Sequence, residues 1–242
     1  DRQGTPVEYA PRSVLRRVLD LYAARGWQPV VAPEIEFYLT RPNTDPDHPL
    51  EPPTGRSGRR AQKAQAYSIV AVDEYDILIE HIYDYAEALG LDIDTVIQEG
   101  GAAQLEINLR HGDPLELADQ VFLFKRLIRE AALRNGCYAT FMAKPMEDQP
   151  GSAMHIHQSV VEAATGRSIF STAEGAPTQE FDHFIGGQQA YLRAACCLMA
   201  PYVNSYRRLA PDLTAPINLD WGRDNRTTGL RVPISEPDAR RV

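Results

Sequence analysis

The chain has 242 residues, with 25 Lys or Arg against 33 Asp or Glu, so its formal net charge is −8. This acidic balance argues against a dedicated duplex-DNA binder, which needs a basic face to neutralise phosphates. Hydrophobic residues make up 43% and charged residues 24%, as in globular domains with a sizeable core. No window approaches the roughly 18 apolar residues of a membrane span, and no signal peptide opens the chain. We therefore expect a cytoplasmic protein without nucleic-acid or membrane partners, and the missing initiator Met suggests part of a longer chain.

Helical periodicity and helix-end signals predict four helices that alternate with strands. Pro11 opens the first helix at a position where its missing N–H costs nothing, and Gly26 ends it. The predicted helices cover about residues 11–25, 73–89, 114–135 and 181–200. Between Pro42 and Gln65 lies a segment rich in Pro, Gly and charge, which we interpret as a mobile excursion. Its run 55–60 lacks the Gly-Lys-Ser/Thr ending of a phosphate-binding P-loop.

The three cysteines do not form a disulfide framework. Their number is odd, and Cys196 and Cys197 are adjacent on a predicted helix, while Cys137 stands alone. We expect reduced thiols, as in intracellular proteins, and assign them no chemistry.

Alternating side chains predict four short strands, at residues 34–39, 104–110, 154–160 and 230–232. One face of each strand is apolar; in the third strand it comprises Met154, Ile156 and Val160. The polar faces hold, in chain order, Glu34, Glu36, Tyr38, Gln104, Glu106, Asn108, Arg110, His155, His157, Ser159 and Arg231. Taken singly, each strand is also compatible with an ordinary half-solvated antiparallel sheet.

The combination of polar residues narrows the interpretation. Carboxylates, imidazoles and arginines are present without a lysine, whereas solvated strand faces usually mix Lys, Thr, Ser and Glu. Neighbouring carboxylates repel one another unless a cation lies between them, and hard divalent cations prefer such oxygens with an occasional imidazole. Arginines bind phosphate through paired hydrogen bonds. Together these residues indicate phosphoryl transfer from a nucleotide.

Five motifs, in this order, resemble the catalytic domain of the type I glutamine synthetase family from about Pro11 to the last residue. They are residues 33–37, Glu99 with 104–106, 141–145, 151–157, and 204–208 leading to Asn225, Arg226 and Arg231. The resemblance implies an α+β fold in which a curved antiparallel β-sheet forms an active-site funnel backed by helices. It also implies that residues 1–242 are one catalytic domain, lacking the family's N-terminal β-grasp domain and C-terminal end. The full-length family forms homo-oligomers, stacked rings of twelve subunits.

The resemblance further implies two divalent-metal sites, for Mg²⁺ or Mn²⁺, with ATP as co-substrate. Carried over by motif, Glu36, Glu99 and Glu106 would hold the first metal, and Glu34 and His155 the second. The other matched positions are His157 and Ser159 near the nucleotide, Arg226 and Arg231 at the phosphates, and Arg208 and Gly151 at the substrate glutamate. The implied reaction phosphorylates the γ-carboxylate of L-glutamate with ATP, and an amine then displaces phosphate to leave an amide.

Two departures from the family pattern bear on the amine. Ammonia-using members carry Glu before an Ala-Pro pair and Asn before the Gly of the glutamate loop, where this chain has Thr214 and Pro150. A hydroxyl cannot serve as a base near neutral pH. The segments 218–222 and 224–227 are more similar to the branch that joins glutamate to polyamines or other organic amines, such as γ-glutamylputrescine and γ-glutamylpolyamine synthetases.

Three alternatives stay open from the sequence. The first is glutamine synthetase proper, which uses ammonia, and the second is a catalytically inactive structural or sensing relative. The third is a metal-dependent hydrolase, which needs further His and Asp ligands on later strands. The remaining histidines, at positions 48, 81, 111 and 183, lie instead in predicted loops or helices.

Overall fold

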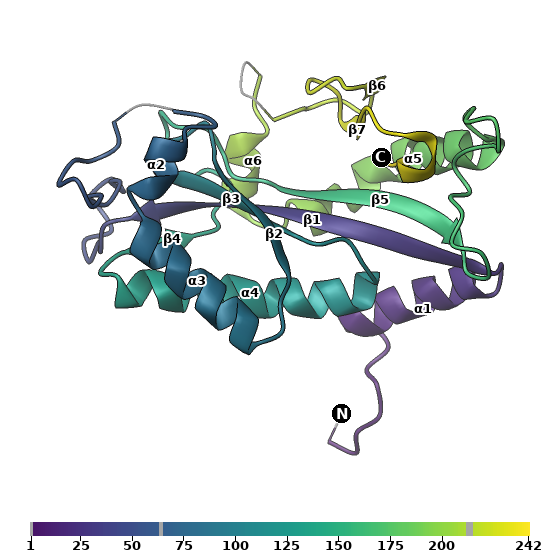
Figure 1. Ribbon diagram of the computed structural model, residues 1–242, viewed down its shortest axis with the longest axis horizontal. Coiled ribbons are helices and arrows are strands. Elements are labelled where there is room, and N and C mark those ends of the chain that lie inside the picture. The colour runs from purple at the N-terminus through teal and green to yellow at the C-terminus, as the bar shows by residue number, and fades with distance from the viewer. Residues whose placement is uncertain (1, 63–64, 212–214) are drawn as a thin grey trace.

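The structure, a computed structural model, describes residues 2–62, 65–211 and 215–242 (Figure 1). Its helices are α1 (Pro11–Ala23), α2 (Ile69–Asp73), α3 (Asp76–Ala88), α4 (Pro114–Arg134), α5 (Gln179–Met199), α6 (Val203–Arg208) and a 3-10 turn, η1 (Pro237–Ala239). Its strands are β1 (Trp27–Thr40), β2 (Ile93–Gln98), β3 (Gln104–Leu109), β4 (Tyr138–Thr140), β5 (Met154–Glu162), β6 (Trp221–Arg223) and β7 (Leu230–Val232).

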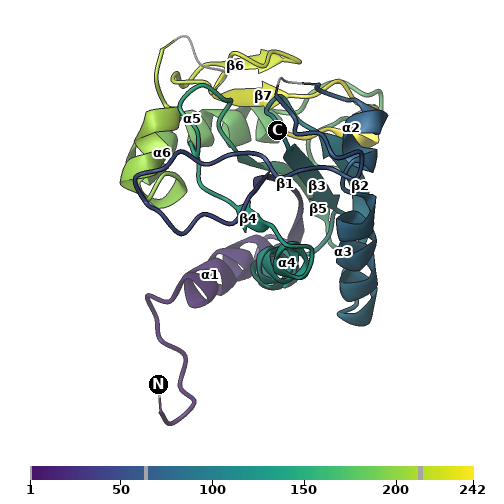
Figure 2. The same cartoon turned by 90° about the vertical axis from the view of Figure 1, so that its left-hand side faces the viewer.

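A five-stranded antiparallel sheet lies at the centre of the molecule. Its strands run in the order β2-β3-β1-β4, and β5 also pairs with β1. Helices α1, α3 and α4 lie below the sheet in Figure 1, and α5, α6, β6 and β7 lie above it, as Figure 2 shows from the side. This architecture confirms the predicted α+β fold with an antiparallel sheet and helices.

Strand β1 is longer than predicted because its two prolines remove no ladder hydrogen bond. The Val31 N–H donates to the Gly112 carbonyl, so the backbone nitrogens of odd-numbered residues face the β3 side of β1. Pairing with β3 begins only at Glu34, whereas β5 pairs along the preceding residues on the other edge. Pro29 and Pro33 therefore place their missing N–H groups where no strand needs them.

The main core fills the space between the sheet and helices α3 and α4. It is built from the predicted apolar faces of β1 and β3 and from one side of each helix, with Ile35, Phe37, Leu39, Leu105, Ile107, Ile82, Phe124 and Ile128 among its members. Full burial of such a side chain contributes about 1.5–3 kcal/mol to stability. A second cluster, on the other side of β5, joins Val160, Phe170, Phe181, Ile185, Leu230 and Val232.

All four predicted helices form close to their expected bounds. The Asp113 side chain caps α4 by accepting from the Leu115 and Glu116 N–H groups, at 2.9 and 3.0 Å. The helix predicted at 73–89 begins only at Asp76, because the chain first forms α2, which Ser68 caps, and then turns. Helix α2 packs against β2.

Two strands differ from their predicted surroundings. β7 does not join the antiparallel sheet but pairs in parallel with β6. In β5 only Val160 enters a core, whereas Met154 and Ile156 remain 47% and 45% exposed. Within the sheet β5 pairs with β1 at one side, beyond the core between the sheet and α4, and Gln158 of β5 also pairs with the Val242 backbone.

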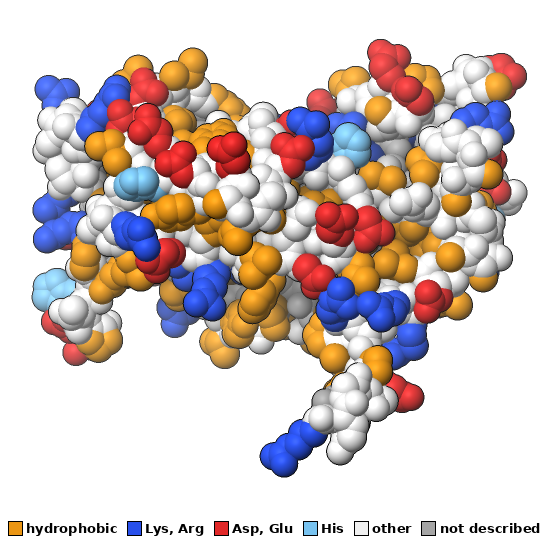
Figure 3. All heavy atoms as spheres, turned by 60° about the horizontal axis from the view of Figure 1, so that its bottom comes forward, with side chains coloured by type: hydrophobic (Ala, Val, Ile, Leu, Met, Phe, Trp, Pro, Cys, Tyr) orange, Lys and Arg blue, Asp and Glu red, His pale blue; other side chains and the backbone are white. Residues whose placement is uncertain are grey.

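The described part of the segment 42–65 is irregular, as predicted, but two of its three arginines form ion pairs. Arg56 reaches Asp76 at 2.5 Å and Arg60 reaches Glu51 at 3.0 Å. The cysteines are free thiols. Among the described residues, none of the helices is both long and apolar enough to cross a membrane. Apolar side chains are scattered among charged ones on the face that carries the lower helices (Figure 3).

Candidate active site

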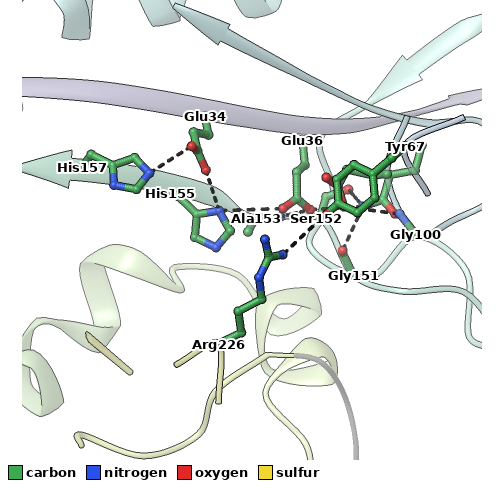
Figure 4. Close-up of polar contacts among 12 residues, drawn as sticks. Glu34, Glu36, Tyr67, Gly100, Gly151, Ser152, Ala153, His155, His157 and Arg226 are labelled. Atoms are coloured by element: carbon green, nitrogen blue, oxygen red, sulfur yellow. Dashed lines mark hydrogen bonds and ion pairs between the residues drawn. The ribbon is translucent and has the colours of Figure 1, made fainter. Parts of the chain in front are cut away.

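The register of the sheet sets the predicted polar residues side by side on one face. Glu34 of β1 lies opposite His155 of β5 on one edge and Asn108 of β3 on the other. Two residues along, Glu36 lies opposite Glu106. The close-up in Figure 4 shows Glu34 and Glu36 projecting from β1 on the same side, with His155 beneath them. The alternation in the sequence therefore predicted this shared face correctly.

Glu34 lies between two histidines. Its Oε1 is 2.9 Å from His157 Nε2, and its Oε2 is 3.3 Å from His155 Nδ1. These hydrogen bonds hold the pKa of Glu34 well below its usual range. The bond between Glu34 and His155 also raises the pKa of His155. Ser159, two residues beyond His157, lies on the same face of β5.

Glu36 and Glu106 are buried, with exposures of 9% and 6%. Glu36 Oε2 accepts from the Ala153 N–H at 2.9 Å and from Gln104 Nε2 at 3.1 Å. Burial nevertheless raises the pKa of Glu36, and burial together with the charges of Glu34, Glu99 and Glu36 raises the pKa of Glu106 to about 7. A cation bound beside these carboxylates would favour their charged forms and offset the cost of their burial.

Glu99 completes the acidic cluster from the turn after β2. It is half-buried, and its charge acts on both Glu36 and Glu106. Among the described residues, the group whose ligand atoms all lie within 4.8 Å of one another comprises Glu34, Glu106 and His155. This group takes one member from the first predicted metal set and two from the second.

A buried tyrosine fixes the turn that carries Glu99. The Tyr38 hydroxyl donates to the Pro150 carbonyl at 2.8 Å, and its ring lies against Gly101. A Cβ on Gly101 would lie 1.8 Å from that hydroxyl oxygen. Gln104 adds a second tie, because its Oε1 accepts from the Gly101 N–H at 2.8 Å.

The predicted glutamate-binding residues Gly151 and Arg208 are brought together. A Cβ on Gly151 would lie 2.6 Å from the Ala143 carbonyl oxygen and 2.7 Å from the Arg208 side chain. Asn204 holds this arrangement, because its side chain accepts from the Lys144 N–H and donates to the Lys144 carbonyl, both at 2.8 Å. Arg208 ends α6, and its charge acts on Glu36, one of the predicted metal ligands. Two separate sequence motifs thus form one structural unit.

The two predicted phosphate arginines differ in their surroundings. Arg226 extends toward the cluster, and its Nη1 donates to the Tyr67 hydroxyl at 3.3 Å (Figure 4). Arg231 lies on β7 and pairs with Asp224 at 2.7 Å.

Sequence reasoning assigned no role to several residues that shape the site. Gln104 and Asn108 stood on the predicted polar face, so alternation alone could have included them. Asn204 lay in a quoted motif, but its contact with a segment 60 residues away is tertiary. Tyr67 left no signal, because its left-handed backbone, with φ 63°, is visible only in the fold.

Comparison with known proteins identifies the family. A family model described as the glutamine synthetase catalytic domain matches residues 8–242. The chain belongs to the glutamine synthetase catalytic-domain family. γ-Glutamylputrescine synthetase PuuA of Escherichia coli K12 is 37% identical over 100% of this chain and 52% of its own length. Glutamine synthetase of Pyrococcus horikoshii is 35% identical over 96% of this chain and 49% of its own length.

A solved structure gives the same relationship. A GmaS/ADP complex matches with a TM-score of 0.78 and 30% identity, covering 99% of this chain and 54% of that one. The chain thus spans about half the length of the curated relatives it matches. Within this family, the oxygen-rich set of Glu34, Glu36, Glu99 and Glu106 with His155 fits divalent cations by its donor chemistry. Thr214, on which part of the amine prediction rests, lies outside the described residues.

Proposed function

We propose that this protein is an ATP-dependent ligase that joins the γ-carboxylate of L-glutamate to an amine. The observation that carries the proposal is the acidic face of the sheet, which is bordered by Arg208 and Gly151 in a chain of this family. A buried set of carboxylates with raised pKa values suits a site that works with cations and phosphates.

In this proposal the acidic face holds two cations, Mg²⁺ or Mn²⁺. Glu36, Glu99 and Glu106 would hold one, and Glu34 with His155 the other. When bound, such cations orient the phosphates of ATP and screen the repulsion between ATP and the glutamate carboxylate. Each oxygen of Glu34 already contacts one histidine, so its carboxylate is oriented before any cation arrives.

The remaining predicted residues bind and orient the substrates. Arg208 would pair with a carboxylate of the substrate glutamate. Because Gly151 has no side chain, the aliphatic part of Arg208 has room to approach the loop. Arg226 and Arg231 would stabilise the charge on the transferring phosphoryl group, for which Arg231 must exchange its pairing with Asp224. Nucleotide binding would fall to His157 and Ser159.

The reaction then proceeds in two balanced steps. A γ-carboxylate oxygen attacks the terminal phosphorus of ATP, and the bond to the bridging oxygen breaks to release ADP. The nitrogen of the amine next attacks the γ-carbon of the acyl phosphate, so that inorganic phosphate leaves and an amide and a proton remain. The chain's contribution is to align carboxylate and phosphate and to balance their charge.

Several lines of support favour an organic amine, most simply a polyamine, as the acceptor. One relative is a γ-glutamylputrescine synthetase. Pro150 and Thr214 replace the Asn and Glu of ammonia-using members. The relatives named glutamine synthetase support ammonia as the second candidate, and a structural or sensing relative is the third. As in the family, we expect a cytoplasmic homo-oligomer, with twelve subunits at full length.

An amine panel tests this proposal. The full-length protein is incubated with ATP, Mg²⁺, L-glutamate and, in turn, ammonia, putrescine, spermidine or a monoamine. The readouts are phosphate release and the mass of the γ-glutamyl product, and Glu36→Gln serves as the inactive control. Turnover with an organic amine above that with ammonia supports the proposal, and highest turnover with ammonia refutes the choice of amine. No ATP-dependent product with any amine would identify the structural or sensing relative.

A further inference from the structure

Gln104 of β3 lies between the acidic face and the glutamate loop around Gly151, and none of the predicted roles falls to it. Its side chain is buried, with the residue only 1% exposed. Its Nε2, which carries two hydrogens, lies 3.1 Å from Glu36 Oε2 and 3.0 Å from the Gly151 carbonyl oxygen. One amide group thus contacts a predicted metal ligand and a predicted glutamate-binding residue.

The other end of the amide fixes its orientation. Oε1 accepts from the Gly101 N–H at 2.8 Å, in the turn that carries Glu99. In the reverse orientation, the amide oxygen would face the ionised Glu36 carboxylate and the Gly151 carbonyl, which only accept hydrogen bonds. The amide nitrogen would at the same time face the Gly101 N–H, donor against donor. Gln104 therefore has one favourable orientation, in which it joins β1, the turn after β2 and the glutamate loop.

The same contact orients Glu36. Its Oε2 also accepts from the Ala153 N–H at 2.9 Å, whereas its Oε1 lies 4.0 Å from His155 Nδ1 (Figure 4). Both hydrogen bonds use Oε2, which leaves Oε1 as the oxygen that Glu36 would offer to a cation. The position of the glutamate loop therefore acts on this carboxylate through the backbone of Ala153 and the side chain of Gln104.

Two further hydrogen bonds join the glutamate loop to the turn that carries Glu99. Tyr38 donates to the Pro150 carbonyl at 2.8 Å, and Gln149 Oε1 accepts from the Ala102 N–H at 2.9 Å. These two bonds hold the loop against the turn, but neither involves a carboxylate. The Gln104 amide, by contrast, joins the loop to a carboxylate of the acidic face.

We propose that Gln104 is a positioning residue that couples cation binding at Glu36 to glutamate binding beside Gly151. The inference rests on the proposed function and deepens it. A cation that binds Glu36 favours the loop position in which the Gln104 bridge is intact. L-Glutamate held by Arg208 favours the same position, because its binding loop contributes one end of the bridge. Each ligand therefore tightens the binding of the other, by the same factor in both directions.

Mn²⁺ binding to the full-length protein, measured by electron paramagnetic resonance with and without saturating L-glutamate, tests this coupling without any assay of turnover. The site followed is the one that Glu36→Gln weakens. In the wild type, L-glutamate should tighten this site about 5- to 150-fold. Gln104→Met puts a side chain of similar length there, without the donor. Its coupling factor should be lower by at least about 5-fold, because a hydrogen bond to a charged group is lost.

Gln98→Met is the matched control. Gln98 is buried as well, at 3% exposed, and its Nε2 donates to two carbonyls of the same turn, at 3.2 and 2.9 Å. These bonds involve neither Glu36 nor Gly151. Gln98→Met should therefore change Mn²⁺ affinity equally with and without L-glutamate and keep the wild-type coupling factor. An unchanged factor in Gln104→Met, or an equal loss in both variants, would overturn the inference.

Amide hydrogen exchange of the wild type gives a second test, which does not depend on the folding of a variant. The Gly101 N–H is bonded to Gln104 Oε1, so its exchange reports on the bridge. In EDTA, L-glutamate alone should slow exchange in a peptide that contains Gly101, as measured by mass spectrometry. Unchanged exchange in that peptide would also overturn the inference. A wild-type protein that binds neither Mn²⁺ nor L-glutamate would instead contradict the proposed function itself.

Discussion

Glu106 couples the protonation of the acidic face to the stability of the fold. Its folded pKa of about 7 lies above the usual carboxyl value, so the folded protein keeps a proton that the unfolded chain has lost. The resulting stabilisation is complete below the unfolded pKa and disappears as the pH rises through 7. For a side chain this deeply buried, the loss is on the order of 3 kcal/mol.

We therefore expect the metal-free protein to melt at lower temperature as the pH rises. In EDTA, Tm should fall by roughly 5–10 °C between pH 5 and pH 8, and excess Mg²⁺ should reverse the fall at pH 8. Glu106→Gln removes the titrating group, so its Tm in EDTA should vary less with pH than that of the wild type. His155, with its raised pKa, adds to the same trend in both proteins. A Tm that rises from pH 5 to pH 8 in EDTA would contradict this account.

The role of Gly151 can be tested by a substitution that adds a single carbon atom. Gly151→Ala places a Cβ 2.6 Å from the Ala143 carbonyl and 2.7 Å from Arg208, so the loop or the arginine must move. Because misplacement of a binding group by about 1 Å costs on the order of 100-fold, kcat/KM for glutamate should fall by 10- to 100-fold. In Gly112→Ala the new Cβ meets its nearest neighbour at an ordinary 3.7 Å, and activity should be retained. Equal kinetics for both variants would remove Gly151 from the glutamate site.

At the scale of elements, Asn204 joins α6 to the segment that precedes the glutamate loop. Asn204→Ala removes both hydrogen bonds to the Lys144 backbone, which should destabilise the protein by about 1–3 kcal/mol and raise KM for glutamate. Asn43 makes the same two-bond arrangement, donating to the His48 carbonyl and accepting from the Asp45 N–H, but in an exposed loop. Asn43→Ala should therefore leave KM unchanged. Urea unfolding and initial rates check both expectations, and an unaltered KM in Asn204→Ala would contradict the positioning role.

Sequence periodicity predicted the elements best where one physical rule dominated. The alternation in β1 correctly placed Glu34 and Glu36 on one face, because side chains in a strand alternate without exception unless a bulge intervenes. The same rule misjudged Met154, because burial depends on whether a helix covers that stretch of the sheet. The predicted strand began only after Pro33 and so missed the first half of β1. A proline disrupts a strand only where its nitrogen faces a neighbouring strand that needs a hydrogen bond.

The sequence predicted the chemical groups of the site but not the tertiary contacts that position them. The carboxylates and histidines occur in local motifs, so their types and spacing were readable. Tyr67, by contrast, meets Arg226 across 159 residues, and no local pattern encodes such a contact. The grouping of Glu106 with Glu34 and His155 likewise depends on side-chain directions across three strands.

At the scale of the whole molecule, much apolar surface stays uncovered. Several of the most exposed apolar side chains lie along the end of α5 and the start of α6, with Leu198 at 80% and Val203 at 85%. Figure 3 shows further apolar side chains, scattered among charged ones, on the opposite face that carries the lower helices. Exposed patches of this kind usually mark contacts with other chains or segments. In relatives about twice as long, there is chain enough to cover them.

We accordingly expect the 242-residue chain, expressed alone, to self-associate and to turn over little or no substrate. Light scattering after size-exclusion chromatography should report species larger than one chain. The paired change Leu198→Gln with Val203→Gln should shift the distribution toward the monomer, whereas Gln28→Leu on the sheet should not. Robust ligase activity from a well-behaved monomer would contradict this expectation.

The contact between Tyr38 and Gly101 has a consequence for natural variation. A methyl carbon at position 101 would lie 1.8 Å from the Tyr38 hydroxyl oxygen. Small shifts of either group cannot relieve so close a contact. Homologues in which the glycine has been replaced should therefore have lost the phenol as well, so the two columns of a future alignment are expected to change together. That co-variation would be evolutionary evidence that the Tyr38 phenol and the residue at position 101 are sterically coupled.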